Sequence, residues 1–400
     1  MSTWLLPRSE LTPEQLRAIE LPHTDHQVIF GAPGSGKTQV LIHRADELRR
    51  RLSLPQERFR IFVYTNALKR YIRSALDLLG LPEETVITFD DWCRHLYQRY
   101  ISRSLPWDEY ADQPDFHAMR EAVKSLVTSG MLPVPMYDFA LVDEGQDLSP
   151  VSFEVLKRIA RHVTVCLDSR QQIYEHGSDE GEILAALGVR RRNLTLLDAY
   201  RCSPFVASLA AQLLEEGERA QYLRQVRTEQ TERQTPLLFK AASFDEEKER
   251  LIAVLRERLL CDQRIAILFP LRRQVMGFAH ALQAAGLEVE SQQELDFSSH
   301  RPKLLTYHSA KGLTFDTVLL PRLVESSFRR VAEERRRRLL FVAITRATRW
   351  VYLSTVQGTE LALLDALEPL LAQRILTKQE RKDRPDKWPE DRPESDLDFL

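Results

Sequence analysis

The chain of 400 residues lacks a long apolar run, closely spaced cysteines and a basic amino-terminal leader. Its longer apolar stretches, such as residues 339–344, fall far short of the ~20 residues that span a membrane. The four cysteines, at positions 93, 166, 202 and 261, show no paired metal-ligand spacing, which argues against a zinc or iron–sulfur site and suits a reducing cytosol. We therefore expect a cytoplasmic protein with no secretory signal and no membrane span.

A surplus of positive charge is also missing, because 56 Lys and Arg residues face 58 Asp and Glu residues. Proteins that bind nucleic acid often carry a basic surplus. Composition alone therefore does not indicate nucleic acid, and any contact with a strand must be a local groove in which base stacking supplies part of the affinity. The length favours two or three domains.

Short apolar runs rich in β-branched and aromatic residues alternate with longer amphipathic segments. They form two series: residues 28–30, 61–64, 85–88, 139–142, 163–167 and 194–197, and then 237–240, 265–269, 303–307, 317–320 and 351–354. Strands that alternate with helices predict parallel sheets covered on both faces. The predicted fold class is therefore α/β with two tandem lobes, residues 1–197 and 198–377. The first lobe carries a short helical insert at 98–137 with no further strand, and the charged, proline-rich residues 378–400 predict a disordered acidic tail.

One segment matches the phosphate-loop pattern G-x-x-x-x-G-K-[ST]. It reads Gly31-Ala32-Pro33-Gly34-Ser35-Gly36-Lys37-Thr38. It follows a predicted strand and opens a predicted helix, which is the context that the motif requires. We expect its backbone N–H groups to cradle the phosphates of ATP, Lys37 to reach the β- and γ-phosphates, and Thr38 to bind Mg²⁺.

An acidic pair, Asp143-Glu144, ends the predicted strand at residues 139–142. Ligands lie at the carboxyl ends of the strands of a parallel sheet, so this pair is expected beside the phosphate loop. Asp143 is then a candidate metal ligand, and Glu144 a candidate general base that activates water. An acidic helix start that opposes the helix dipole is the alternative interpretation.

The run Val142-Asp143-Glu144-Gly145-Gln146-Asp147 resembles the VDE-x-QD box of the UvrD/Rep-like superfamily 1 helicases, and segments similar to their other boxes follow the same order along the chain. Those segments are Leu11-Thr12-Pro13-Glu14-Gln15, Val63-Tyr64-Thr65-Asn66, residues 85–93, Gln171-Gln172-Ile173-Tyr174, Ala199-Tyr200-Arg201-Cys202, Thr306-Tyr307-His308-Ser309-Ala310-Lys311-Gly312-Leu313 and residues 339–347. The resemblance covers roughly residues 11–350 and implies two RecA-like P-loop lobes.

The resemblance also implies roles for these residues. Gln15 binds the edge of the adenine and Tyr200 stacks on its ring, while Gln171 senses the γ-phosphate. Arg201 and Arg346 act as arginine fingers. The implied nucleic-acid contacts are stacking by Tyr64 and Tyr174, and backbone or sugar contacts by Thr65, Asn66, Thr88, Thr306 and His308.

Several of these residues have a structural alternative. Thr12-Pro13-Glu14-Gln15 is also a sound helix start, in which Gln15 closes a capping box. Tyr64 can simply pack against a helix. His308 can be a structural histidine. For Arg346, the apolar surroundings predict a buried position.

The sequence also departs from the family pattern. Gln39 stands where the family has an arginine beside the base, and Thr314 replaces a glutamate that contacts the ribose. Asp90-Asp91 place negative charge near the expected strand path, which predicts weakened or altered nucleic-acid contact. Only residues 286–302 stand where the family has a second large accessory domain.

The resemblance implies an ATP-dependent translocase or helicase on single-stranded DNA, moving 3′-to-5′, with ATP and Mg²⁺ as cofactors and with RNA as the alternative strand. A nucleotide-gated switch that recruits a partner without processive movement is the rival hypothesis, and a small-molecule P-loop kinase is a more distant one. The last residues, 394–400, are similar to the docking tip of bacterial single-strand-binding proteins, which suggests the hypothesis that the tail binds a protein partner. A solvated tail that serves solubility is the alternative, and charge runs at chain termini usually indicate it.

Overall fold

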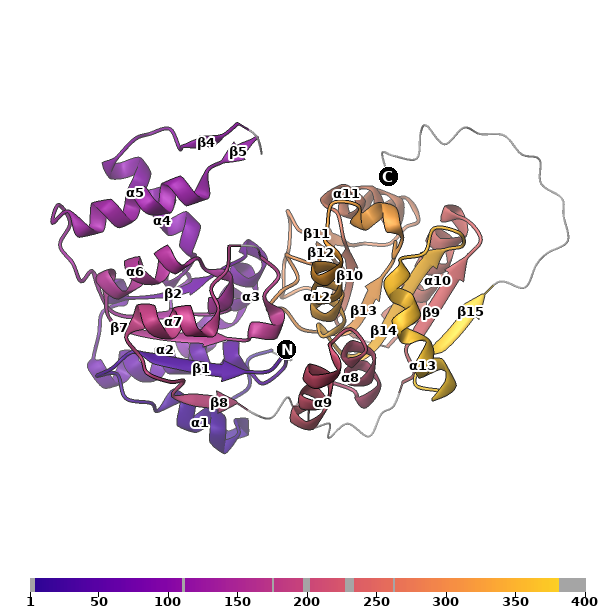
Figure 1. Ribbon diagram of the computed structural model, residues 1–400, viewed down its shortest axis with the longest axis horizontal. Coiled ribbons are helices and arrows are strands. Elements are labelled where there is room, and N and C mark those ends of the chain that lie inside the picture. The colour runs from indigo at the N-terminus through magenta and orange to yellow at the C-terminus, as the bar shows by residue number, and fades with distance from the viewer. Residues whose placement is uncertain are drawn as a thin grey trace, which may run out of the picture. The chain divides into compact units, whose positions relative to one another are not determined.

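The computed structural model describes residues 4–109, 112–174, 176–196, 202–226, 234–261 and 263–380. The chain divides into two compact units, Met1–Ala199 and Tyr200–Leu400. Each unit is built on one largely buried sheet of parallel strands (Figure 1). Among the described residues, no helix is long and apolar enough to cross a membrane.

The sheet of the first unit has six strands in the order β3-β2-β6-β7-β1-β8. Their bounds are β1 Gln27–Gly31, β2 Phe59–Val63, β3 Val86–Thr88, β6 Tyr137–Val142, β7 Ala160–Leu167 and β8 Leu194–Leu196. All pairs in this sheet are parallel, for example β1 with β7 and β2 with β6. Seven of the eight residues of β7 are buried, as expected of a strand that is covered on both faces.

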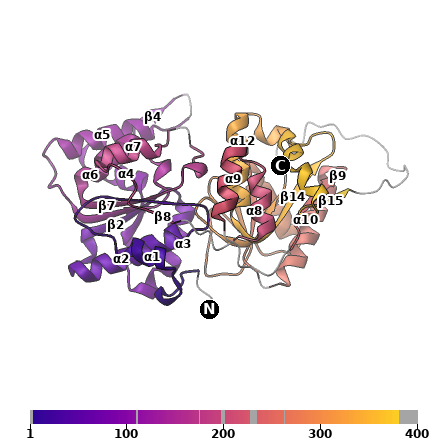
Figure 2. The same ribbon diagram turned by 60° about the horizontal axis from the view of Figure 1, so that its bottom comes forward.

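The helices of the first unit cover both faces of its sheet. They are α1 Pro13–Ile19, α2 Lys37–Leu52, α3 Asn66–Leu76, α4 Phe89–Tyr100, α5 Phe116–Thr128, α6 Pro150–Ile159 and α7 Glu180–Leu187. Right-handed crossovers place helices on opposite faces when the chain reverses its direction across a sheet. The chain runs from β1 outward to β3 and then returns, so α2 lies on one face and α4 to α7 lie on the other (Figure 2).

The predicted insert at 98–137 belongs to the core of this unit. The buried side chains of α5, such as Met119 and Val123, share one apolar cluster with Phe62 of β2 and Trp92 of α4. The expectation that the insert has no strand is wrong, because β4 (Trp107–Asp108) and β5 (Gln113–Pro114) form a short antiparallel pair. Two-residue strands are too short to show an alternating pattern in the sequence.

The sheet of the second unit has seven strands in the order β11-β12-β10-β13-β14-β9-β15. Their bounds are β9 Leu237–Ala241, β10 Ile265–Phe269, β11 Glu290–Ser291, β12 Lys303–Thr306, β13 Phe315–Leu320, β14 Ala347–Val356 and β15 Thr377–Glu380. The helices are α8 Pro204–Ala211, α9 Glu216–Gln225, α10 Phe244–Leu259, α11 Arg272–Ala284, α12 Glu333–Ile344 and α13 Glu368–Ala372. The predicted strand at each of the eleven apolar runs is present, so the α/β prediction with two parallel-sheet lobes is confirmed.

Strand β15 corrects the predicted start of the tail at residue 378. Its residues pair in parallel with β9, although all four side chains are exposed. An edge strand of this kind is held by backbone hydrogen bonds, so its polar composition resembles that of a tail. Residues 381–400, where the rest of the predicted tail falls, lie outside the described residues.

Candidate nucleotide and nucleic-acid site

The phosphate-loop motif lies between β1 and α2. Gly34 and Gly36 have φ angles of 80° and 82°, in the left-handed region that favours glycine. Gly36 is also the N-cap of α2 and has no side chain to satisfy the first backbone N–H groups of the helix. The buried hydroxyl of Ser35 has no hydrogen-bond partner among the described residues. The loop therefore combines a helix N-terminus with an unsatisfied buried hydroxyl, which fits a bound phosphate.

The two side chains that end the motif contact different parts of the loop surroundings. The ammonium group of Lys37 donates to the carbonyl oxygens of Gly31 at 2.8 Å and Ala32 at 3.3 Å, so the loop itself holds the lysine. The hydroxyl of Thr38 donates to Oδ2 of Asp143 at 2.6 Å across 105 residues of sequence. The predicted neighbourhood of the phosphate loop and the acidic pair is thus present.

The pair of Thr38 and Asp143 fits a magnesium ion. Asp143 is almost fully buried, and burial, together with the negative charge of Glu144, raises its pKa to about 6, although Thr38 and Lys37 oppose the shift. Mg²⁺ prefers hard oxygen ligands and is commonly held by one or two carboxylates. A cation at this position relieves the cost of the buried negative charge, so the donor set and the electrostatics agree.

Glu144 begins a chain of buried polar side chains. Its φ angle is 53°, which is uncommon for a residue with a side chain. The amide of Gln146 donates to Oε2 of Glu144 at 2.6 Å, and its Oε1 accepts from the backbone N–H of Asp168 at 3.0 Å. Oδ2 of Asp168 in turn accepts from the amide of Gln171 at 2.8 Å. The candidate general base and the candidate γ-phosphate sensor are therefore joined by Gln146, which lies in the VDE-x-QD box but had no predicted role, and by Asp168, which the sequence did not single out.

Gln15 closes the predicted capping box, and its side chain also contacts the phosphate loop. The side-chain Oε1 of Gln15 accepts from the backbone N–H of Thr12, and the backbone N–H of Gln15 donates to the Thr12 hydroxyl, which completes the capping box of α1. Its amide nitrogen also donates to the carbonyl of Ser35 in the phosphate loop at 3.0 Å. The capping box thus holds the side chain of Gln15 in contact with the phosphate loop.

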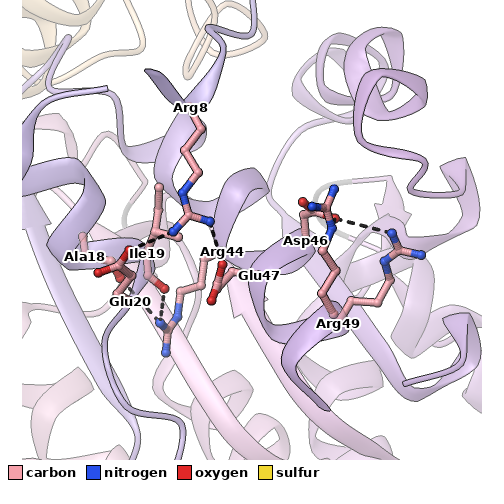
Figure 3. A network of polar contacts seen from close by, with 9 residues as sticks. Arg8, Ala18, Ile19, Glu20, Arg44, Asp46, Glu47 and Arg49 are labelled. Atoms are coloured by element: carbon pink, nitrogen blue, oxygen red, sulfur yellow. Dashed lines mark hydrogen bonds and ion pairs between the residues drawn. The ribbon is translucent and has the colours of Figure 1, made fainter. Parts of the chain in front are cut away.

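The helix that carries Gln15 is tied to the sheet through a buried arginine. Arg44 of α2 donates to the carbonyl oxygen of Ile19 at 2.8 Å (Figure 3). It also donates to the carbonyl of Leu21 at 2.8 Å and to the hydroxyl of Thr164 in β7 at 2.9 Å. Burial lowers the pKa of this guanidinium to about 10. The guanidinium therefore stays charged at neutral pH, and its hydrogen bonds to backbone carbonyls fix the end of α1 beside α2.

The candidate strand contacts of the first unit lie at the carboxyl ends of β2 and β3 and, for Tyr174, in the segment that follows β7. Tyr64 and Tyr174 contact each other, with ring centroids 4.4 Å apart at an interplanar angle of 47°. Both rings are partly buried, and Tyr64 also packs against the apolar core. Asn66 is exposed at the first position of α3. The structure thus brings together two residues predicted to stack on bases, although they are more than a hundred positions apart.

Thr65 and Thr88 act as helix N-caps. The hydroxyl of Thr65 accepts from the N–H of Leu68 in α3, and that of Thr88 accepts from the N–H of Asp91 in α4. Side-chain oxygens at this position satisfy a backbone donor that has no partner inside the helix.

The acidic residues Asp90 and Asp91 are neutralised inside the first unit. Arg120 of α5 donates to both carboxylate oxygens of Asp90 at 2.7 and 2.8 Å. Lys69 of α3 donates to Asp91 at 2.8 Å. Burial alone raises the pKa of Asp91, but hydrogen bonds from Lys69 and Thr88 outweigh it and lower that pKa below its ordinary value. The negative charge that Asp90 and Asp91 place near the expected strand path is therefore balanced by Arg120 and Lys69.

The candidate residues of the second unit lie after β12 and between α12 and β14. The hydroxyl of Thr306 accepts from the N–H of Ser309. His308 is half-buried, and burial, with smaller contributions from Arg335 and Lys311, lowers its pKa to about 4, so the ring is neutral at pH 7. The guanidinium of Arg346 is buried as predicted and donates to the carbonyl of Val342 at 2.9 Å and to that of Leu313 at 3.2 Å. Tyr200 and Arg201 lie outside the described residues.

Comparison with known families agrees with this arrangement. Residues 11–133 match the UvrD/REP helicase N-terminal domain, and residues 303–354 match the UvrD-like helicase C-terminal domain. Both matched stretches are similar to the UvrD/Rep-like helicases, which supports a UvrD/Rep-like helicase. Members of this family are DNA helicases that hydrolyse ATP. The second match contains the segment that begins at Thr306 and the arginine at 346, so each unit carries a stretch that is similar to this family.

Two individual proteins are similar to this chain. A probable DNA helicase of Mycoplasma pneumoniae (strain ATCC 29342 / M129 / Subtype 1) is 27% identical over 242 residues, which cover 54% of this chain and 43% of that protein. The chain thus spans less than half the length of this curated relative. The C-terminal domain of a "possible DNA helicase" from Lactobacillus plantarum WCFS1 shows 19% identity and a TM-score of 0.37, covering 45% of this chain and 98% of that one.

Proposed function

We propose that the chain is an ATP-dependent motor that moves along single-stranded DNA in the 3′-to-5′ direction, and that RNA is its alternative strand. The observation that supports this most is the contact between Thr38 and Asp143 beside a phosphate loop that holds Lys37. Similarity to the UvrD/Rep-like helicases supports ATP and DNA as ligands.

The residues of the first unit suggest how hydrolysis proceeds. The phosphate loop and Lys37 bind the phosphates, and Thr38 and Asp143 hold Mg²⁺, which neutralises phosphate charge when bound. Glu144 accepts the proton of the attacking water at its carboxylate, with Gln146 fixing one of its oxygens. We assign Gln171 to the γ-phosphate, Gln15 and Tyr200 to the base, and Arg201 and Arg346 to the stabilisation of transition-state charge.

The strand is held by stacking and by contacts to its backbone. Tyr64 and Tyr174 already form one aromatic surface, on which a base can stack. Thr65, Asn66 and Thr88 lie at the starts of α3 and α4, where backbone N–H groups favour an anionic phosphate. Thr306 and His308 of the second unit are the further candidates for strand contact.

ATPase measurements test the proposal directly. We expect single-stranded DNA to raise the hydrolysis rate of the full chain. Lys37→Ala loses nucleotide binding or turnover, whereas Glu144→Gln binds ATP but turns over at least ~100-fold more slowly. Glu154→Gln, which changes an exposed carboxylate on α6, is the matched control and keeps the wild-type rate. Near-normal turnover of Glu144→Gln contradicts the general-base assignment.

A nucleotide-gated switch without processive movement is the second candidate. The short connection between α11 and β12, which contains only the two-residue strand β11, favours it because no second accessory domain follows α11. An ATPase rate that is indifferent to every DNA and RNA strand supports the switch over the motor. From the sequence alone we also propose that the last residues of the chain, 394–400, dock a protein partner.

A further inference from the structure

Gln39 is the first residue after the phosphate-loop threonine, and its side chain binds the amino-terminal segment of the chain. We call residues 4–10 the strap. The amide nitrogen of Gln39 donates to the carbonyl of Trp4 at 2.6 Å, and its Oε1 accepts from the N–H of Leu6 at 3.0 Å. Gln39 is buried, and both ends of its amide are used by the strap. An arginine, which has no acceptor, cannot make this pair of contacts.

The strap continues along the same face of α2. His43, one turn after Gln39, places its Nε2 2.9 Å from the carbonyl of Leu6. Burial lowers the pKa of His43, so the ring is neutral at pH 7 and its Nε2–H tautomer donates to that carbonyl. One turn further, Glu47 pairs with Arg8, which also pairs with Glu20 beyond α1 (Figure 3). Contacts at positions 39, 43 and 47 follow the i, i+4 spacing of one helix face.

At its other end the strap is fixed to α3. The ring of Trp4 stacks on that of Tyr71, with centroids 4.3 Å apart at an interplanar angle of 21°. Its indole N–H donates to the carbonyl of Tyr71 at 3.1 Å and also to the hydroxyl of Ser74 at 3.3 Å. Helix α3 begins at Asn66, directly after Thr65, which caps it.

The strap therefore joins the first turn of the phosphate-loop helix to the helix that starts with candidate strand contacts. The same stretch of chain leads on to Gln15, which bonds to Ser35 within the phosphate loop. We propose that the strap couples phosphate binding at the loop to the position of α3, with Gln39 and Trp4 as the positioning residues. This inference rests on the proposed function, because it assumes that the loop binds ATP and that Thr65 and Asn66 contact the strand.

The physical basis is the rigidity of these contacts. The strap is bonded to α2 through both polar atoms of one buried amide and to α3 through a stacked, hydrogen-bonded ring, so a shift of the first turn of α2 moves the strap and α3 together. A coupling free energy of this kind is reciprocal: a bound nucleotide changes the affinity for the strand by the same factor as the strand changes the affinity for the nucleotide.

The experiment measures this factor in the full chain. The dissociation constant of a fluorescent single-stranded oligodeoxynucleotide is determined with and without a non-hydrolysable ATP analogue and Mg²⁺. In the wild type we expect the two constants to differ by about tenfold. Trp4→Phe keeps the stacked ring but loses the indole N–H. We expect both this variant and Gln39→Ala to bring the ratio of the two dissociation constants at least about fivefold closer to one. The affinity for the ATP analogue in the absence of DNA stays within about twofold of wild type, since neither residue is assigned to the nucleotide.

A matched control lies in the second unit. Trp350 is buried to a similar degree, and its indole N–H donates to the carbonyl of Thr235 at 2.8 Å. Trp350→Phe removes the same kind of bond far along the chain and keeps the wild-type ratio. A drop in the ratio for this control as large as that for Trp4→Phe shows a general stability effect and overturns the inference.

Three further results overturn it. One is a wild-type ratio in both Gln39→Ala and Trp4→Phe. Another is loss of ATP-analogue binding in Gln39→Ala, which assigns the residue to the nucleotide itself. The third is a wild-type ratio of one. Stimulation of the wild-type ATPase by DNA is measured in parallel, so the proposed function stands or falls separately.

Discussion

Removal of Arg120 tests whether the paired acids at the start of α4 are compatible with a bound strand. Arg120 lies in α5, in the region of the predicted insert, and its guanidinium holds both oxygens of Asp90. Arg120→Met removes the charge and retains most of the apolar stem. The carboxylate of Asp90 is then left without the guanidinium at a site next to Thr88 and Phe89.

The size of the effect follows from the burial of the pair. The Arg120 side chain is 10% exposed and that of Asp90 is 27% exposed. Breaking a buried ion pair by removing one partner costs about 3–5 kcal/mol, but partial hydration of Asp90 reduces this, and we expect about 2 kcal/mol. For a unit of about two hundred residues, that lowers the unfolding midpoint by about 4–8 °C. In Asp90→Asn/Arg120→Met no charge is unpaired, and most of the loss is recovered.

The assay combines thermal unfolding of the full chain with binding of a single-stranded oligonucleotide. We expect Arg120→Met to weaken DNA binding, more at low ionic strength than at high, and the double variant to restore it. Lys69→Met is the control, because Asp91 keeps a second partner, Arg94, at 3.2 Å, and its loss of stability stays below about 1 kcal/mol. Equal effects of Arg120→Met and Lys69→Met, or no recovery in the double variant, refute this reasoning.

Four other predictions follow from the site and the sequence. Arg346→Ala retains ATP binding but loses turnover in the presence of single-stranded DNA, as measured by nucleotide binding and phosphate release. The purified chain separates long 3′-tailed duplexes poorly in a strand-displacement assay, because only residues 285–302 link α11 to β12. Burial, followed by the charges of Arg44 and His26, lowers the pKa of His162 to about 3 in the folded state against 6.5 when unfolded. Between these two values only the unfolded chain binds this proton, so the free energy of unfolding falls by about 1.4 kcal/mol per pH unit as the pH drops below 6.5. His162→Gln removes this contribution to the slope in urea titrations. Deletion of residues 394–400 leaves the ATPase rate unchanged but abolishes co-purification of a partner, and retrieval of the same proteins by both chains from lysate contradicts the docking role.

The strands were predictable because the signal in each is local. Strand β10 is buried along its whole length, so the five apolar residues that form it are contiguous in the sequence. The phosphate-loop motif was equally predictable, since its spacing is local and the positive φ angle of Gly36, one of its two fixed glycines, favours glycine. Strand β15 gave no such signal, because its four polar side chains are exposed and only its backbone pairs with β9.

The contacts that the sequence did not reveal join residues far apart along the chain. Trp4 and Tyr71 are separated by 67 positions, and Asp90 and Arg120 by 30. No periodicity or motif relates such pairs, so Asp90 looked like unpaired charge and Gln39 like a lost base contact. The partner of Asp90 follows only from the packing of α5 against α4, and the partners of Gln39 follow only from the path of the strap along α2.

The threonines of the candidate strand surface show why a capping role does not compete with the proposed one. A hydroxyl has one hydrogen to donate and two lone pairs that accept. Thr65 uses an oxygen lone pair to cap a backbone N–H, which leaves its hydrogen to donate to a phosphate oxygen. Thr88 also caps a backbone N–H, but its hydroxyl hydrogen-bonds to the Asp91 carboxylate as well. Thr306 is similar to Thr88, because its hydroxyl donates to Ser309 at 3.0 Å while it accepts from the N–H of that residue. We therefore expect Thr65 to donate to a bound strand directly, whereas Thr88 and Thr306 must each exchange a hydrogen bond before they can donate to it.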